Sequence, residues 1–224
     1  MKNETTIVNH VSGNGNIIIS GSNSKNQKGF KSKLDTKQMV LIAMLAALSY
    51  VLMLLHLPFK FLGFLEIEFS DIPALVAGLA YGPVVAVLIE LIKNLIKVIT
   101  NTTTAGVGEL ANFVVSASFM LTACFFYKRL KGNLKPVISL VLATIAMTIV
   151  GAVMNYYVML PLYATFMGGM DNVVAFAAKA IPAIDNPAKL VAYGICPFNI
   201  FKGAYVSIIG CGIYEITRKA LQRG

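Results

Sequence analysis

Long apolar segments alternate with short polar stretches along most of this chain. Apolar runs of about 17–25 residues, the length that an α-helix needs to cross the hydrocarbon core of a bilayer, recur from residue 36 onward. Six membrane segments are predicted: Thr36–Leu57, Ile72–Ala80, Pro83–Ile99, Glu109–Phe126, Pro136 to Leu160 or Tyr163, and Asn199–Ala220. We therefore expect an all-α bundle of six transmembrane helices that occupies residues 34–224.

The connections differ in length and composition. Residues 1–33 are rich in Asn, Gly, Ser and Lys, which predicts a flexible polar tail outside the bundle, without the apolar core of a signal peptide. The second segment is too short to span straight across, and it stops at a predicted tight turn, Tyr81-Gly82-Pro83. The longest connection, 164–197, contains a candidate short helix at Asn172–Ala180.

The distribution of positive charge predicts the orientation of the bundle. With the N-terminus inside, the tail, the turn at 127–135 and the C-terminal end carry most of the lysines and arginines. On the opposite side, a few lysines are matched by acidic residues. Because cytoplasmic loops carry an excess of Lys and Arg, both termini are expected in the cytoplasm.

Composition narrows the class of protein. With 57% hydrophobic and 13% charged residues, the chain is far less charged than soluble domains, so a multi-pass protein of the cell membrane, in contact with lipid, is expected. The net charge of +9 lies in the termini and one turn rather than on an aromatic-interleaved basic face, which argues against nucleic acid. Cys124, Cys196 and Cys211 lack metal-ligand spacing and are predicted to be buried apolar residues.

Catalytic and metal-binding signatures are missing from the sequence. There is no GxxxxGK[ST] phosphate loop, no nucleophile–base pair and no cluster of metal-ligating residues. We expect neither an enzyme nor a metal or cofactor.

Polar residues inside apolar segments are the candidate site. Asn199 and Lys202 lie three residues apart, which puts them on one face of a helix, and Asn155 lies deep in the preceding membrane segment. A charged group in a membrane segment usually faces a protein interior or cavity. Since all three residues fall toward the outer side, they predict a shared pocket more readily than three separate packing contacts.

Two further segments carry polar residues whose role is open. Glu90, Lys93, Asn94 and Lys97 line one helix face, either as a compensated polar seam, with Lys97 reaching the outer surface, or as ligand contacts. At the start of another helix, capping alone explains Glu109, whereas Asn112 lies one turn deeper. The candidate binding residues are Asn155, Asn199, Lys202, Glu109, Asn112, Lys93 and Asn94.

Small residues mark one face of the first segment. Ala43 and Ala47 are four residues apart, a spacing that lets another helix approach closely in lipid. Packing inside the chain and docking of a partner are both open, and packing is favoured on this signal alone.

Five stretches carry a pattern that can be compared with known families: Glu68-Phe69-Ser70-Asp71-Ile72-Pro73-Ala74-Leu75, Glu90-Leu91-Ile92-Lys93-Asn94, Gly106–Phe113, Met154-Asn155-Tyr156-Tyr157 and Pro197–Gly203. Together they resemble the substrate-binding S components of energy-coupling factor (ECF) vitamin transporters, and specifically their riboflavin-binding members. The resemblance covers about residues 36–222, in the same order.

The resemblance implies a vitamin-capture subunit with riboflavin as its transported ligand. It implies that Asn155, Asn199 and Lys202 hold the ligand and that the connections 58–70 and 164–197 cover it. For such a ligand, Lys202 and backbone groups of Thr104–Gly108 are suited to serve its hydroxyls. The resemblance also implies that Ala43 and Ala47 dock on an ECF transmembrane coupling subunit that works with two ATP-binding-cassette ATPases. Alternatives are an S component for another vitamin (thiamin or pantothenate), a self-contained secondary transporter, and a membrane scaffold with a structural polar seam.

Overall fold

The computed structural model of the protein describes residues 35–55, 60–62, 65–102 and 105–221. Most of these residues are helical, and two very short strands form an antiparallel pair with the register Lys60↔Glu66 and Phe61↔Leu65. The elements in chain order are α1 (Thr36–Leu54), β1 (Lys60–Phe61), β2 (Leu65–Glu66), α2 (Asp71–Tyr81), α3 (Pro83–Asn101), α4 (Val107–Arg129), α5 (Lys135–Met154), the π-helix η1 (Asn155–Met159), α6 (Leu160–Met167), α7 (Met170–Ala178), α8 (Pro187–Leu190), the π-helix η2 (Val191–Ile195) and α9 (Cys196–Leu221).

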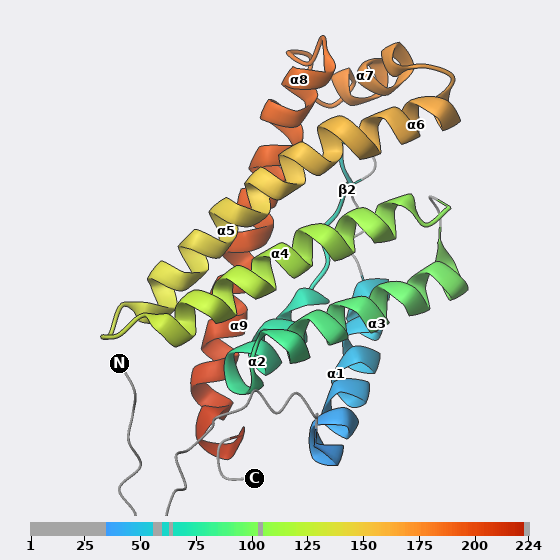
Figure 1. The fold of residues 1–224 in the computed structure, drawn as a ribbon. Helices are drawn as coiled ribbons and strands as arrows, with labels where there is room; N and C mark the ends of the chain where they lie inside the picture. Colours follow the sequence, from blue (N-terminus) through green and yellow to red (C-terminus); the bar gives the residue numbers. More distant parts are fainter. Residues whose placement is uncertain (1–34, 56–59, 63–64, 103–104, 222–224) are drawn as a thin grey trace, which may run out of the picture. The chain divides into compact units, whose positions relative to one another are not determined.

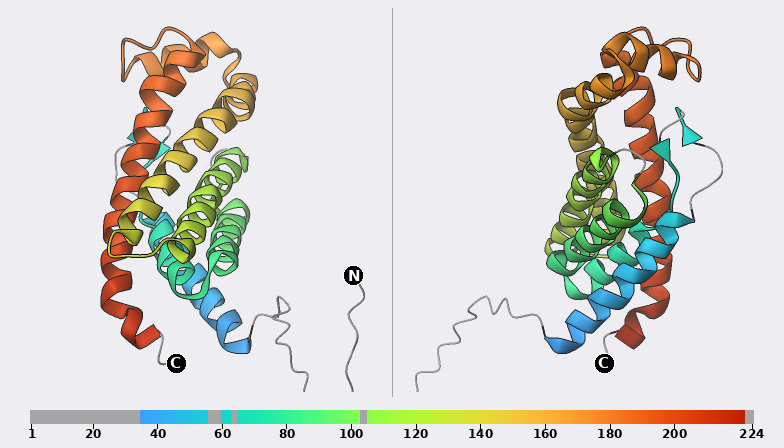
Figure 2. Two further views of the ribbon diagram at one scale, coloured as in Figure 1. Left: turned by 60° about the vertical axis from the view of Figure 1, so that its left-hand side comes forward. Right: turned by 90° about the vertical axis from the view of Figure 1, so that its right-hand side faces the viewer.

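Helix α4 lies between α3 and α5, whereas α9 packs against α5 and α2, and α1 packs against α2 and α3. Figures 1 and 2 show the first turn of α1 and the last turn of α9 toward one end of these helices, with the strand pair and α6–α8 toward the other. The start of α1 and the end of α9 therefore lie at one end of the bundle, opposite the strand pair and α6–α8.

Local sequence explains how the first helices begin. At the start of α1, the Asp35 side chain accepts a hydrogen bond from the Thr36 backbone N–H at 2.8 Å, and the Gln38 side chain returns to the Asp35 N–H. This capping box satisfies two donors that the helix leaves open. Gly82, with φ of 116°, forms the predicted turn between α2 and α3, and Pro83 occupies the first position of α3.

The predicted bounds of the last two long helices were wrong. One continuous helical stretch runs over Lys135–Met167, and another runs from Pro187 through α9. The final helix therefore starts twelve residues before Asn199, and the connection predicted at 164–197 shrinks to 168–186. The predicted short helix at Asn172–Ala180 is confirmed as α7, shifted by two residues.

Both long helices contain a π-helical turn that ends two residues before a proline. η1 ends at Met159 before Pro161, and η2 ends at Ile195 before Pro197. Proline lacks an N–H, and in an α-helix its ring crowds the carbonyl four residues earlier. A wider turn at that carbonyl lets the helix continue past the proline, so Pro161 and Pro197 both lie within helices.

Four helical stretches of the described residues are long and apolar enough to cross a membrane: Thr36–Leu54, Val107–Arg129, Lys135–Met167 and Pro187–Arg218. Two further helices, α2 and α3, do not meet these criteria of length and apolarity. α2 is apolar but has only 11 residues, and α3 has 19 residues but carries Glu90, Lys93 and Lys97. The three cysteines are free: Cys124 is buried as predicted, while Cys196 and Cys211 are half-buried.

Candidate functional site

A cavity of about 350 Å³ opens among α1, α3, α4, η1, α6, η2 and α9, with β2 along one side. Pockets that take small organic ligands range from about 300 to 1,000 Å³. Apolar and polar side chains share its wall, which is formed by Met53, Leu65, Glu66, Glu68, Lys97, Gly108, Glu109, Ala111, Asn112, Val115, Asn155, Tyr163, Ile195, Phe198, Asn199 and Lys202. Five of the seven predicted binding residues thus meet at one cavity, from three separate parts of the chain.

Two buried amides face this cavity with hydrogen-bonding capacity to spare. The Asn155 side chain donates from Nδ2 to the Gly151 carbonyl at 2.8 Å, which leaves its Oδ1 atom for another partner. Among the described residues, the side-chain amide of Asn199 has no hydrogen-bond partner, although Asn199 is only 5% exposed. Because unsatisfied buried amides are costly, they indicate a place for a ligand or for water.

The approach of Asn199 to α5 depends on a glycine that the sequence analysis missed. A Cβ atom on Gly151 would lie 2.3 Å from Asn199 Nδ2, far inside any real contact distance. Gly151 therefore provides the space in which the Asn199 amide sits, one helical turn before Asn155.

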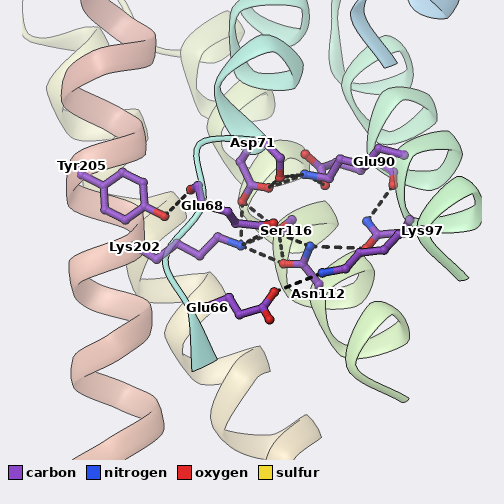
Figure 3. Close-up of polar contacts among 12 residues, drawn as sticks. Glu66, Glu68, Asp71, Glu90, Lys97, Asn112, Ser116, Lys202 and Tyr205 are labelled. Carbon is purple, nitrogen blue, oxygen red and sulfur yellow. Dashed lines mark hydrogen bonds and ion pairs between the residues drawn. The ribbon is translucent and has the colours of Figure 1, made fainter. Parts of the chain in front are cut away.

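Lys202 reaches from α9 to α2 and α4 at the floor of the cavity (Figure 3). Its Nζ atom lies 3.0 Å from Asp71 Oδ2 and 2.8 Å from Asn112 Oδ1, and the Ser116 hydroxyl oxygen is 3.4 Å away. Glu68 Oε1 is farther, at 3.8 Å. The ammonium group is thus fixed in position and balanced in charge by the chain itself.

Beneath the cavity, Asp71 joins the two buried lysines into one network. Its Oδ1 atom lies 2.5 Å from Lys93 Nζ, and Lys93 also contacts Glu90 Oε2 at 2.7 Å and the Ser70 hydroxyl oxygen at 2.8 Å. The Ser116 hydroxyl donates to Asp71 Oδ2 at 2.8 Å. Lys93 and Glu90 are fully buried, and the ammonium group of Lys93 is compensated by the carboxylates of Asp71 and Glu90.

A second set of contacts orients Asn112, the predicted residue on α4. Its Nδ2 atom donates to Glu68 Oε1 at 3.1 Å and lies 3.3 Å from Asn94 Oδ1. The Asn94 amide in turn donates to the Glu90 carbonyl at 2.8 Å, and the Tyr205 hydroxyl donates to the Glu68 carbonyl at 2.6 Å. Of the predicted binding residues, Lys93 and Asn94 therefore support the cavity floor and do not line it.

Near β2, two acidic side chains of the lining have partners. Lys97 Nζ pairs with Glu66 Oε2 at 3.2 Å, with both side chains largely buried, so Lys97 does not reach the outer surface as a free charge. The Thr102 hydroxyl donates to Glu109 Oε2 at 3.1 Å. Of the backbone segment predicted to serve ligand hydroxyls, Gly108 lines the cavity and Thr104 lies outside the described residues.

On α1, the two small residues singled out from the sequence face away from the other helices. Ala43 and Ala47 are exposed, whereas Ala46 between them is fully buried. Exposed residues Met44 and Leu48 extend the same apolar face. The spacing alone favoured packing inside the chain, but Ala43 and Ala47 do not pack against its other helices.

Sequence reasoning missed the carboxylates that accompany the lysines: Glu68 and Asp71 lie in a stretch that carries the resemblance but are not among the candidate binding residues. A signal was present, since lysines within membrane segments almost always pair with acidic groups or backbone carbonyls. Among the described residues, no group of three His, Cys, Asp or Glu side chains is arranged to hold a metal ion.

Long apolar helices around a ligand-sized cavity with unsatisfied amides define an integral membrane protein that binds a small molecule. The family model for the substrate-specific component of ECF transporters matches residues 37–214. The chain belongs to this family, which confirms the predicted family and the expectation of a binding protein rather than an enzyme.

Curated relatives and a solved structure agree with this assignment. The chain is 36% identical to the riboflavin transporter FmnP of Bacillus subtilis over 79% of this chain and 89% of that protein. It is 37% identical to the riboflavin transporter RibU of Staphylococcus aureus over 84% of this chain and 94% of that one. A solved bacterial ECF S component superimposes with a TM-score of 0.67 at 34% identity and covers 83% of this chain and 97% of its own.

Proposed function

We propose that this protein captures riboflavin for uptake by an ECF transporter. The observation that carries the proposal is the pair of buried amides, Asn155 and Asn199, at the wall of one cavity with Lys202 on its floor. The isoalloxazine ring is flat and largely apolar, with a dione edge on which an N–H lies between two carbonyl oxygens. Asparagine amides supply the acceptor and the donors that such an edge requires.

The size and lining of the cavity support the same ligand. Its volume of about 350 Å³ lies at the compact end for small-molecule pockets, and apolar side chains such as Met53, Val115 and Phe198 offer faces for a ring. The names of the relatives, which are riboflavin transporters, point to the same compound.

Titration of purified protein with riboflavin tests the proposal, because a flavin enclosed among protein side chains loses its fluorescence. Wild-type protein should quench riboflavin and copurify as a yellow complex. Asn199→Ala should weaken binding by about 10–100-fold, the loss expected for one buried hydrogen-bonding group. Asn172→Ala removes an exposed amide on α7 and is the matched control, with unchanged affinity.

Two results would reject riboflavin as the ligand. The first is that the purified protein carries no bound riboflavin and does not quench the fluorescence of added riboflavin. The second is that thiamin or pantothenate displaces bound riboflavin at a lower concentration than riboflavin itself requires, which would assign the cavity to that vitamin.

The topology that fits this role has six crossings, with α2 and α3 completing the four long apolar helices. The short α2 can cross only with its ends inside protein, and the buried pairing of Glu90 and Lys93 removes the main objection to α3. Both termini are then on the cytoplasmic side of a prokaryotic plasma membrane, with the basic residues of the α4–α5 turn on the same side. Modification of single introduced cysteines by an impermeant reagent tests this arrangement.

Energy for transport would come from partner subunits. We propose that the exposed face of α1 around Ala43 and Ala47 is where an ECF transmembrane coupling subunit docks, since small residues let a partner helix approach closely in lipid. The coupling subunit would in turn carry two ATP-binding-cassette ATPases. A self-contained secondary transporter would instead take up riboflavin without any of these subunits.

A further inference from the structure

A groove of about 710 Å³ lies between α5 and α9, and its lining residues are all different from those of the ligand cavity. Its walls are residues of 137–149 on α5 and of 200–211 on α9. The two helices touch along it, since a Cβ atom on Gly203 would lie 2.6 Å from the Thr144 side chain. Both helices belong to the stretches that are long and apolar enough to cross a membrane, so the groove opens toward lipid.

The surface of this groove is apolar, although some of its residues carry hydroxyl groups. Thr144 and Thr148 donate their hydroxyls to backbone carbonyls one turn earlier on α5, at 2.9 and 2.8 Å. The Ser207 hydroxyl oxygen is itself buried and does not reach the groove surface. Exposed branched residues such as Ile208 line the groove, and the small side chain of Ala204 leaves space that a larger one would fill. A hydrocarbon chain offers the matching surface.

The length of the groove matches one leaflet of a bilayer. At 1.5 Å per residue, Val137 to Ile149 span about 18 Å along α5, and Ile200 to Cys211 span about 17 Å along α9. The hydrocarbon core of a bilayer is about 30 Å thick, so one leaflet supplies about half of that. An acyl chain of one leaflet therefore fits the groove, whereas a membrane-spanning helix of a partner protein would need a groove that crosses both leaflets.

Two opposite charges follow the groove on α9, at the end where α5 begins. Arg218 lies seven residues after Cys211, which is two turns farther along the same helix face. Its side chain reaches back toward the groove, where its Nη1 atom lies 3.0 Å from Glu215 Oε2. The two side chains are 46% and 41% exposed, so both can take further partners. Lys135, at the start of α5, lies instead over the ring of Tyr127 on α4.

We propose that this groove binds one molecule of phosphatidylethanolamine, a phospholipid whose headgroup carries a phosphate and an ammonium group. One acyl chain lies between α5 and α9, in the inner leaflet of the proposed topology. The phosphate pairs with Arg218 and the ammonium group with Glu215, so one ion pair within the protein is exchanged for two with the lipid. An anionic headgroup such as that of phosphatidylglycerol has no cation for Glu215 and is repelled by it. The lipid site does not depend on which compound the ligand cavity binds.

Native mass spectrometry of the purified protein in detergent, with equal amounts of phosphatidylethanolamine and phosphatidylglycerol, tests the headgroup. Wild-type protein should retain one phosphatidylethanolamine per chain, with about a threefold preference over phosphatidylglycerol, as expected of partly exposed charge contacts. Glu215→Gln should abolish this preference. Arg218→Gln should lower the retention of both lipids about threefold, and Arg218→Lys, which keeps the charge, should retain more of them than Arg218→Gln. Equal retention of the two lipids by wild-type protein would overturn the proposal.

A larger side chain in the groove tests the place of the acyl chain. Ala204→Phe should lower the retention of phosphatidylethanolamine at least about threefold, because the displaced chain carbons lose their packing contacts. Ala43→Phe makes the same change at an exposed position of α1 and is the matched control, with the retention of wild type.

A single gel-filtration peak and a cooperative melt show whether the Ala204 variant is folded; if it is not, the variants of Glu215 and Arg218 decide. Unchanged retention in folded Ala204→Phe protein would refute the groove as the site. A complex of two chains in the wild type that Ala204→Phe separates would also refute it, because a second copy of the protein would then cover the groove.

Discussion

Replacement of Asp71 by asparagine tests whether the buried ion network holds the helices together. Asp71 lies between two ammonium groups, 2.5 Å from Lys93 Nζ and 3.0 Å from Lys202 Nζ, and it accepts a hydrogen bond from Ser116. All four side chains are buried, with Asp71 only 1% exposed. Asparagine has nearly the same shape but no charge, so the variant isolates the electrostatic contribution.

The expected loss follows from the burial of both partners. Removing one member of a buried ion pair costs about 3–5 kcal/mol, because an uncompensated charge remains. Glu90 still balances Lys93, and the asparagine oxygen accepts one hydrogen bond, which places the loss at about 3 kcal/mol. For a chain of this length, 1 kcal/mol shifts the melting temperature by about 2–4 °C, so Asp71→Asn should melt about 6–12 °C below wild type.

Thermal unfolding in detergent, followed by intrinsic tyrosine fluorescence or by aggregation, measures this shift. Asp185→Asn is the matched control, since it breaks a pair with Lys189 of 2.5 Å in which the side chains are 62% and 41% exposed. Because solvent screens an exposed pair, this variant should melt close to wild type. Equal shifts in the two single variants would refute the reasoning.

Two predictions concern the cavity and the partner surface. Gly151→Ala should weaken riboflavin binding at least tenfold, because the new methyl group displaces the Asn199 amide from its place beside α5; fluorescence titration measures the effect. Ala43→Trp and Ala47→Trp should leave binding by the purified protein unchanged, since both residues are exposed, and should abolish riboflavin uptake by whole cells.

These two predictions have separate controls. Gly212→Ala adds the same methyl group to α9 in open space and should bind riboflavin as wild type does. An equal loss of affinity in both glycine variants would show that the effect does not depend on Asn199. For α1, Ile216→Trp changes an exposed residue on a different helix and should leave uptake intact. Full uptake by the Ala43 and Ala47 variants would remove the docking role from this face.

The fold was predictable where apolar length and local capping decide the structure. The capping box at Asp35 and the Gly82–Pro83 turn are local features, so the starts of α1 and α3 were correct. The extents of the last two long helices were not, because they depend on whether a helix continues past Pro161 and Pro197. That depends on a π-helical turn stabilised by surrounding helices, which no single proline reveals.

The candidate site was predictable in part for a related reason. Asn155, Asn199 and Lys202 were identifiable because placing a polar or charged side chain in an apolar membrane helix costs free energy. Asp71 was not, because its position at the start of a short helix offered an adequate local explanation. The role of Gly151 could not be predicted from the sequence either, because it depends on how closely α9 approaches α5.

The contacts of Lys202 bear on which kind of ligand the cavity selects. An ammonium group has three donors, and Asp71, Asn112 and Ser116 place three oxygen atoms within 3.4 Å of this one. An anionic ligand such as pantothenate would have to compete with Asp71 for Lys202, at the cost of a buried carboxylate. The groups left open at the wall include the neutral amides of Asn155 and Asn199, which discriminate by hydrogen-bond pattern, and the Oε2 atom of Glu68. A neutral ligand with an imide-like edge therefore fits this cavity better than an anionic vitamin, and the ion network fixes the geometry in which the amides meet it.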